Sequence, residues 1–353
     1  MSRRRAIYLL TAGLAGTIGR TASGLDEAHA DTAFPLLGSE GASAKAPSKT
    51  RRSVRNTTTT SSPGPKPTTR TTRTTVGSGP TDPWALFPHT VHATRSGSTV
   101  VVESSGLPGH PMMIGIKSWQ QQVPLPQPFT GSNAWKLPAR GALADTPISA
   151  RNALFRGAIA LAVNGVPIFN ALNNRGDDAF LFGELDQWGG HCGRADDYHY
   201  HIAPLHLQNV TGASLPLAFA LDGYPMFGLT EPDGSPVRPL DEFNGHSDPD
   251  GGYHYHATLT FPYVNGGMRG RVSVRDDGIE PQPATPPIRP PSSPLRGATI
   301  TAFTTDGPTS HLEYRLDGGL YRIDYTISQT KVTMTFTNPS GTSRVETYNR
   351  RSA

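Results

Sequence analysis

One segment of this 353-residue chain occurs twice. Residues 186–201 read DQWGGHCGRADDYHYH and residues 241–256 read DEFNGHSDPDGGYHYH, so the pattern Asp-x4-His-x7-His-x-His recurs at an offset of 55 residues. A second match precedes each copy, because AVNGVPIF at 162–169 is echoed by ALDGYPMF at 220–227, at an offset of 58. Self-similarity of this kind predicts two copies of one supersecondary unit packed together.

The residues of both copies favour β-structure. Apolar runs at 159–163 and 217–221 are each followed by a turn pair, Asn164-Gly165 or Asp222-Gly223, so each copy is expected to begin with a hairpin. Residues 99–105 read as another strand. Residues 150–156 fit either a short helix or a loop. We therefore predict a mostly β fold with an internally duplicated β domain at 83–279, its copies spanning about 157–205 and 215–260.

Two further segments follow this domain. The proline-rich residues 280–295 favour an extended backbone and are predicted to be a linker. Residues 296–353 alternate apolar and polar side chains, as in KVTMTF at 331–336, and predict a small C-terminal antiparallel β module.

The N-terminal residues are of a different kind. Residues 1–30 combine three consecutive arginines, an apolar run and Ala28-His29-Ala30, which indicates an export signal. It resembles a twin-arginine leader, with an ordinary secretory leader as the alternative. The apolar run is too short for a membrane-spanning helix, so we expect no transmembrane span in the mature form. Residues 31–82 are rich in Ser, Thr, Pro and Arg and are predicted to be a disordered stalk.

The charge distribution bears on the partners. Residues 45–73 hold eight Lys or Arg and no acid, whereas 20 basic and 24 acidic residues follow position 73. The folded part is therefore mildly acidic, which argues against nucleic-acid binding. The basic stalk is suited to contact with a cell wall or another envelope surface. The sequence specifies no oligomeric state, and its single cysteine excludes an intramolecular disulfide.

The histidines predict a metal site in each copy. Side chains alternate between the two faces of a strand, so the paired imidazoles of a Tyr-His-Tyr-His run share one face, and an earlier histidine can fold back to them. Three imidazoles and one open position resemble a catalytic zinc site, and such sets also suit copper. The predicted ligands are His191, His199, His201, His246, His254 and His256. The two sets form either two mononuclear sites or, if they face each other, one binuclear centre.

Nearby carboxylates are predicted either to ligate the ion or to support the imidazoles by accepting their second ring N–H groups. They are Asp186, Asp196 and Asp197 in the first copy and Asp241, Asp248 and Asp250 in the second. The acidic turn at 248–251 makes weak calcium binding an alternative, although it lacks the ligand spacing of an EF-hand.

Other interpretations of the same residues stay open. The Tyr and His side chains can form a metal-free hydrogen-bonded network that fixes the packing of two β units, and metal-free acid–base chemistry is a third interpretation. Cys192 is either an additional ligand or a buried small residue. No separate nucleophile or general base stands out.

The paired Gly-His and Tyr-His-Tyr-His elements, the LDGYPMFG turn at 221–228 and the sequence FPYVNGGMRG at 261–270 resemble the YHYH-domain family of exported bacterial proteins. The resemblance covers about residues 110–275. It implies export and domain identity, and it assigns no activity.

The sequence thus predicts an exported metal-binding protein whose two repeats hold one or two divalent ions. A metal-dependent hydrolase or oxidase acting on an envelope or extracellular substrate is one alternative. A metal-free structural or surface-interaction protein is the other.

Overall fold

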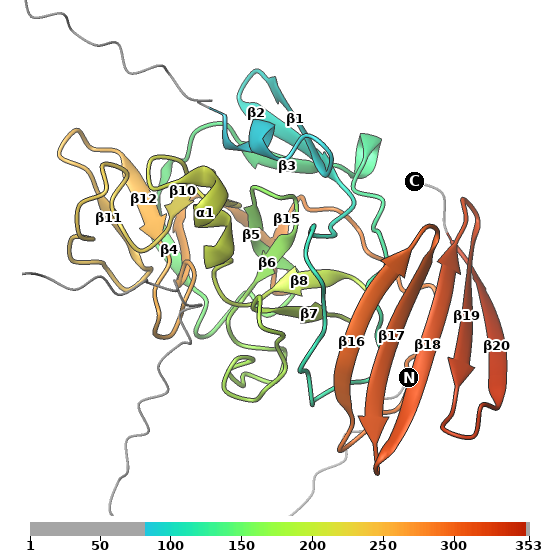
Figure 1. Ribbon diagram of the computed structural model, residues 1–353. Coiled ribbons are helices and arrows are strands. Elements are labelled where there is room, and N and C mark those ends of the chain that lie inside the picture. Colours follow the sequence, from blue (N-terminus) through green and yellow to red (C-terminus); the bar gives the residue numbers. More distant parts are fainter. Residues whose placement is uncertain (1–81, 351–353) are drawn as a thin grey trace, which may run out of the picture. The chain divides into compact units, whose positions relative to one another are not determined.

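The computed structural model describes residues 82–350, and this part of the chain is mostly β, as predicted. It contains five sheets (Figure 1). The predicted export signal, the predicted stalk as far as residue 81 and residues 351–353 lie outside the described residues. Within 82–350, every helix is too short or too polar to cross a membrane.

The repeated segments build an eight-stranded sheet with the order β11-β12-β10-β9-β5-β6-β8-β7. The strands of the first copy are β5 (Ala158–Ala162), β6 (Pro167–Phe169), β7 (Gly190–Cys192) and β8 (Tyr198–Tyr200). Those of the second copy are β9 (Ala218–Ala220), β10 (Pro225–Phe227), β11 (Gly245–Ser247) and β12 (Tyr253–His256).

The two halves of this sheet follow one pattern of pairing. In the first half β5 pairs antiparallel with β6, β6 parallel with β8, and β8 antiparallel with β7. In the second half β9, β10, β12 and β11 pair in the same order and sense. The halves join through antiparallel β5 and β9. Four strands therefore separate β8 from β12, which is roughly 24 Å at about 4.8 Å per strand.

Both predicted hairpins are confirmed, with turns at Asn164-Gly165 and Asp222-Gly223. Gly165 and Gly223 have φ of +82° and +88°, the left-handed region that glycine adopts without steric cost. Space is also tight at the first turn, because a Cβ on Gly165 would lie 2.6 Å from the Ser104 Cβ. The turn residues thus set the register of each hairpin.

Smaller elements surround the eight-stranded sheet. The remaining strands of this region are β1 (Val91–Ser96), β2 (Thr99–Ser104), β3 (Trp135–Pro138), β4 (Leu143–Ser149), β13 (Gly267–Gly270), β14 (Ser273–Arg275) and β15 (Gly278–Glu280). The helices are short: η1 (Pro83–Leu86), η2 (Gly131–Asn133), η3 (Leu205–Leu207) and α1 (Gln208–Thr211). Residues 150–156 form a turn and a loop, so of the two alternatives for this segment the loop is correct and the short helix is not.

The predicted C-terminal antiparallel β module is confirmed as a five-stranded meander. Its strands are β16 (Thr299–Asp306), β17 (Thr309–Leu316), β18 (Gly319–Ile327), β19 (Lys331–Thr337) and β20 (Ser343–Asn349). The module contacts the loop at 112–127. Ile300 bonds through its backbone with Gly115 and Ile116, at 2.9 and 3.1 Å. The Tyr325 hydroxyl donates to the Pro124 carbonyl at 2.7 Å.

The proline-rich segment, predicted to be a linker, lies against the duplicated domain. Gln282 Oε1 accepts a hydrogen bond from the Ala158 N–H at 2.9 Å. Arg289 forms a bidentate ion pair with Asp196 at 2.6 and 2.8 Å, and both side chains are buried. Arg289 also donates to the Gln121 carbonyl at 2.6 Å. One guanidinium therefore ties three separate segments together.

Loss of this ion pair is expected to destabilise the fold strongly. Arg289→Met leaves the buried Asp196 carboxylate without its counter-charge, which typically costs about 3–5 kcal/mol. Urea unfolding measures the change. The matched control is Arg275→Met, which removes the exposed ion pair with Glu280 and should cost less than about 1 kcal/mol. Equal losses of unfolding free energy in the two variants would contradict the role of Arg289 in tying the segments together.

Candidate metal centres

The strand pairing brings the third histidine of each copy beside the other two. His199 and His201 follow the alternation of an extended strand and share one face, with Tyr198 on the other. In the antiparallel register of β7 and β8, His191 lies directly opposite His199. In β11 and β12 the corresponding residues are opposite each other in the same way. Cross-strand neighbours on one face are in contact. The pairing of β7 with β8 and of β11 with β12 therefore brings together histidines that are separated in the sequence.

In the first cluster the Nε2 atoms of His191, His199 and His201 converge. The Nε2 of His201 lies 3.2 Å from that of His199 and 3.1 Å from that of His191. Behind the rings, His199 Nδ1 lies 3.0 Å from the Asp197 carbonyl oxygen and His201 Nδ1 lies 2.5 Å from that of Asn170. A carbonyl only accepts, so both Nδ1 atoms carry the proton and both Nε2 atoms present a lone pair.

Lone pairs that face each other at this distance repel unless a proton or another cation lies between them. Burial, together with the neighbouring imidazoles, holds the pKa of His191 well below its usual range. Burial also lowers the pKa of His201 to about 3. A proton is therefore not held at neutral pH, and the arrangement suits a metal cation.

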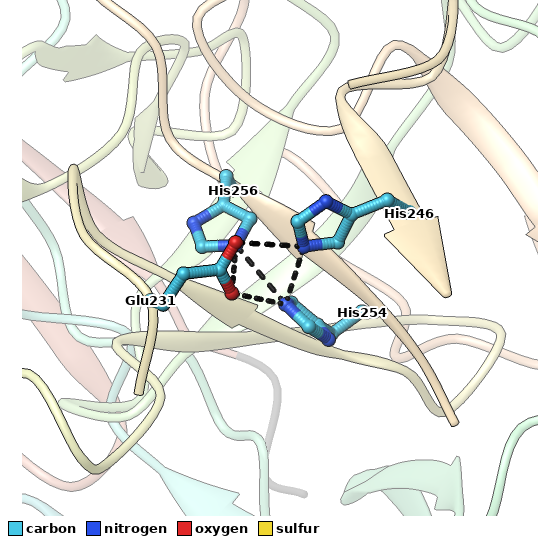
Figure 2. A group of neighbouring side chains, drawn as sticks. All are labelled: Glu231, His246, His254 and His256. Atoms are coloured by element: carbon cyan, nitrogen blue, oxygen red, sulfur yellow. Dashed lines mark hydrogen bonds and ion pairs between the residues drawn. The ribbon is translucent and has the colours of Figure 1, made fainter. Parts of the chain in front are cut away.

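In the second cluster a carboxylate joins the imidazoles. Figure 2 shows Glu231 with His246, His254 and His256. The Nε2 of His254 lies 2.9 Å from that of His246 and 3.0 Å from that of His256. Oxygens of Glu231 lie 3.3, 3.4 and 3.6 Å from the three Nε2 atoms. His256 Nδ1 contacts the Gly228 carbonyl at 3.0 Å, so its Nε2 also presents a lone pair.

A charged network encloses the second cluster. Arg238 Nη2 lies 3.3 Å from His246 Nε2 and 2.8 Å from an oxygen of Asp248, whose other oxygen lies 3.2 Å from His254 Nδ1. Burial opposes ionisation of Glu231, but hydrogen bonds from Arg238 outweigh it and lower the pKa of Glu231 to about 2. This carboxylate is therefore an anionic donor across the neutral range. Among the described residues, the buried His246 Nδ1 finds no hydrogen-bond partner.

Both clusters could hold a divalent ion. Ligand atoms at the usual 2.0–2.1 Å from zinc lie roughly 2.9–3.4 Å from one another when the angles between them run from 90° to the tetrahedral value. The spacings of neighbouring Nε2 atoms, 2.9–3.2 Å, fall within this range. The second cluster offers four donors and the first offers three.

Sequence reasoning missed Glu231. At the offset of 58 it corresponds to Asn173, and each of these residues stands four positions after the phenylalanine that ends β6 or β10. The backbone repeats as well, because Asn173 and Glu231 accept from Gly176 and Gly234 at 2.9 Å. A polar residue at this position in both copies was the available signal. Only the second copy carries a carboxylate there, so the motif did not reveal it.

The predicted supporting residues Asp186 and Asp241 lie on the tyrosine side of the strands. Asp186 accepts from the Tyr198 hydroxyl at 2.9 Å and from the Gly190 N–H at 3.2 Å. Asp241 accepts from the Tyr253 hydroxyl at 3.0 Å in the equivalent place. Each carboxylate thereby fixes the turn that precedes the first histidine of its copy.

The other predicted carboxylates have different surroundings. Asp197 Oδ2 lies 3.5 Å from His199 Nδ1, which is the kind of contact predicted. Asp196 pairs with Arg289, and Asp250 accepts from a backbone N–H in its own turn. Cys192 is buried, and burial raises the pKa of its thiol well above the usual range. Its sulfur is not among the ligand atoms that converge in the described part of the chain.

The clusters differ in access. A cavity of about 930 Å³ is lined by all three histidines of the first cluster, and none of its lining residues comes from the second. Phe169, also on the cavity wall, stacks on His199 with ring centroids 3.8 Å apart and holds that imidazole in place. The first cluster therefore opens on a large cavity, whereas Glu231 and Arg238 surround the second.

The fold and these clusters define a β protein with two histidine-rich groups that could each hold a metal ion. Residues 134–235 match the family model described as YHYH protein, so the chain carries a YHYH domain and the resemblance seen in the sequence is confirmed. The match includes the whole first cluster and Glu231, and it ends before His246. No curated protein and no solved structure matches the chain.

The metal-free protein is expected to lose stability as the pH falls below about 6.5, the usual value for an imidazole. In the folded state His201 stays neutral until about pH 3, so between these values the unfolded state binds more protons and the free energy of unfolding decreases. Each such imidazole contributes about 1.4 kcal/mol per pH unit. Urea unfolding in chelator at pH 7.5, 6.5 and 5.5 measures the slope. His201→Gln should reduce the slope and His92→Gln, an exposed control, should not; a flat profile would contradict the lowered pKa of His201.

Proposed function

We propose that this chain is an exported protein that binds two divalent metal ions in two unequal centres. The observation that carries the proposal is the convergence of imidazole Nε2 lone pairs, which hydrogen bonds at Nδ1 fix in both copies. Export is supported by the basic and apolar residues of the leader.

The second centre has the features of a structural site. Three imidazoles and one carboxylate complete four donors, the closed set found where zinc stabilises a fold. Its ligands come from β11, β12 and the loop after β10, so an ion there would join three segments of the second copy. The nitrogen and oxygen donors favour zinc, with copper as the other metal that suits them.

The first centre has the features of a reactive site. Three neutral imidazoles leave one coordination position free, and the cavity makes that position accessible. An ion held this way would supply Lewis acidity, which makes metal-assisted hydrolysis the second candidate function. The chain's own part is to fix the tautomers of His199 and His201 through the Asp197 and Asn170 carbonyls and to orient His199 through Phe169.

Metal content tests the proposal directly. Protein freed of metal by a chelator and then given zinc is expected to bind two ions per chain. His201→Ala removes a central ligand of the first cluster and should reduce the content to one, while the exposed control His92→Ala keeps two. Elemental analysis after gel filtration gives the stoichiometry. A wild-type chain that retains no ion would favour the metal-free Tyr/His network instead.

The structural role of the second centre predicts a stability effect. Zinc should raise the Tm of the wild-type chain, because an ion that binds only the folded state stabilises it. Glu231→Gln removes the anionic donor with little change in shape, and we expect zinc affinity at this centre to fall at least about tenfold and most of the Tm increase to be lost. The control is Glu242→Gln, an exposed glutamate outside both clusters and outside the cavity lining. Calorimetric zinc titration and thermal unfolding measure both effects; an unchanged Tm increase in Glu231→Gln would exclude this carboxylate as a ligand.

A further inference from the structure

The cavity beside the first cluster collects positive charge in a part of the chain that is otherwise acidic. Residues 82–350 contain 19 Lys and Arg and 24 Asp and Glu. The cavity lining nevertheless includes five of these cations and only two carboxylates, Glu184 and Asp197. A concave surface with an excess of one sign of charge attracts ions of the opposite sign. The charge of the lining therefore favours an anion.

Most of this positive charge is uncompensated. Arg175 pairs with Glu184 and with Asp177. The other four cations of the lining form no ion pair within the described residues: Lys117, Arg156, Arg194 and Arg296. Arg156 and Arg194 donate one hydrogen bond each to backbone carbonyls, at 3.3 and 3.0 Å. Lys117 and Arg296 have no side-chain partner in residues 82–350 and are exposed. They are free to bind a ligand.

Part of the cavity wall is aromatic. Trp119, Phe155, Phe169 and Phe182 line it together with the cations. A volume of about 930 Å³ lies within the range of sites for small organic molecules. The lining thus provides contacts for an apolar body as well as for an anionic group.

We propose that this cavity binds a small organic phosphate ester, with the phosphate held by Lys117, Arg156 and Arg296 and the organic group packed on the aromatic wall. Several free cations favour a doubly charged oxyanion over a single carboxylate, and a phosphate monoester carries about −1.5 to −2 at pH 7. Guanidinium groups also match the geometry of phosphate oxygens. The choice of ligand follows from the cavity lining alone. Only the place of the phosphate, beside the open position of the first centre, rests on the proposed function.

The test uses calorimetric titration of the full chain with phenylphosphonate, inorganic phosphate and phenol at low salt. The titration is made on metal-free and on zinc-loaded protein. Failure to bind zinc would contradict the proposed function, whereas binding of the anions to metal-free protein tests this inference separately. Metal-free protein should bind phenylphosphonate more tightly than phosphate, should not bind phenol, and should lose affinity as salt is added. Zinc should strengthen the binding of both anions.

Two charge-matched double variants locate the site. Lys117→Gln/Arg296→Gln should weaken phenylphosphonate binding about tenfold, because two cations beside the anion are lost. Lys136→Gln/Arg315→Gln removes two exposed cations that do not line the cavity and should change the affinity less than about twofold. Equal losses in both variants, no binding by the wild type, or equal affinities for phosphate and phenylphosphonate would each overturn the proposal.

Discussion

The candidate centres depend on one kind of hydrogen bond, from an imidazole Nδ1 to a main-chain carbonyl. It holds His201 on Asn170 in the first copy and His256 on Gly228 in the second. Because the acceptor belongs to the backbone, the ring orientation is set by the fold and needs no further side chain. The same bond fixes the tautomer of these rings, so that their Nε2 is the free nitrogen. Strand register then brings the other histidines of each copy beside them.

The two copies share this frame and differ in what surrounds it. Glu231 stands where the first copy has Asn173, which bonds to the Glu184 side chain at 3.1 Å. On the tyrosine side, Tyr255 donates to Asp222 at 2.5 Å, whereas Tyr200 receives a bond from Asn164 at 3.1 Å. In both pairs the first copy carries the neutral amide and the second the carboxylate. The difference between Asn173 and Glu231 leaves the first cluster with three donors and gives the second a fourth.

Much of the fold and the composition of each histidine group could be predicted from the sequence. The signals that predicted them are local: strand alternation in Tyr-His-Tyr-His, the Asn-Gly and Asp-Gly turns, and the alternating C-terminal residues. Each lies within a short stretch of sequence and does not depend on contacts between distant segments. Glu231, Arg238 and the ion pair of Arg289 with Asp196 depend on contacts between distant segments. The question of one shared centre or two likewise depended on strand order, which places β8 and β12 apart. No spacing within the sequence carries that information.

On one face of the sheet, the junction between the two copies is made of very small side chains. Across β5 and β9, Ala160 lies opposite Ala220 and Ala162 opposite Ala218, and all four are buried. Alanines leave room for tight sheet packing and carry no group that ionises or binds a ligand. On this face, the junction of the eight-stranded sheet therefore carries no ionisable side chain between the two histidine clusters. The two ends of the sheet can therefore differ in their side chains without changing the junction, as the proposed structural site in the second copy and the proposed reactive site in the first require.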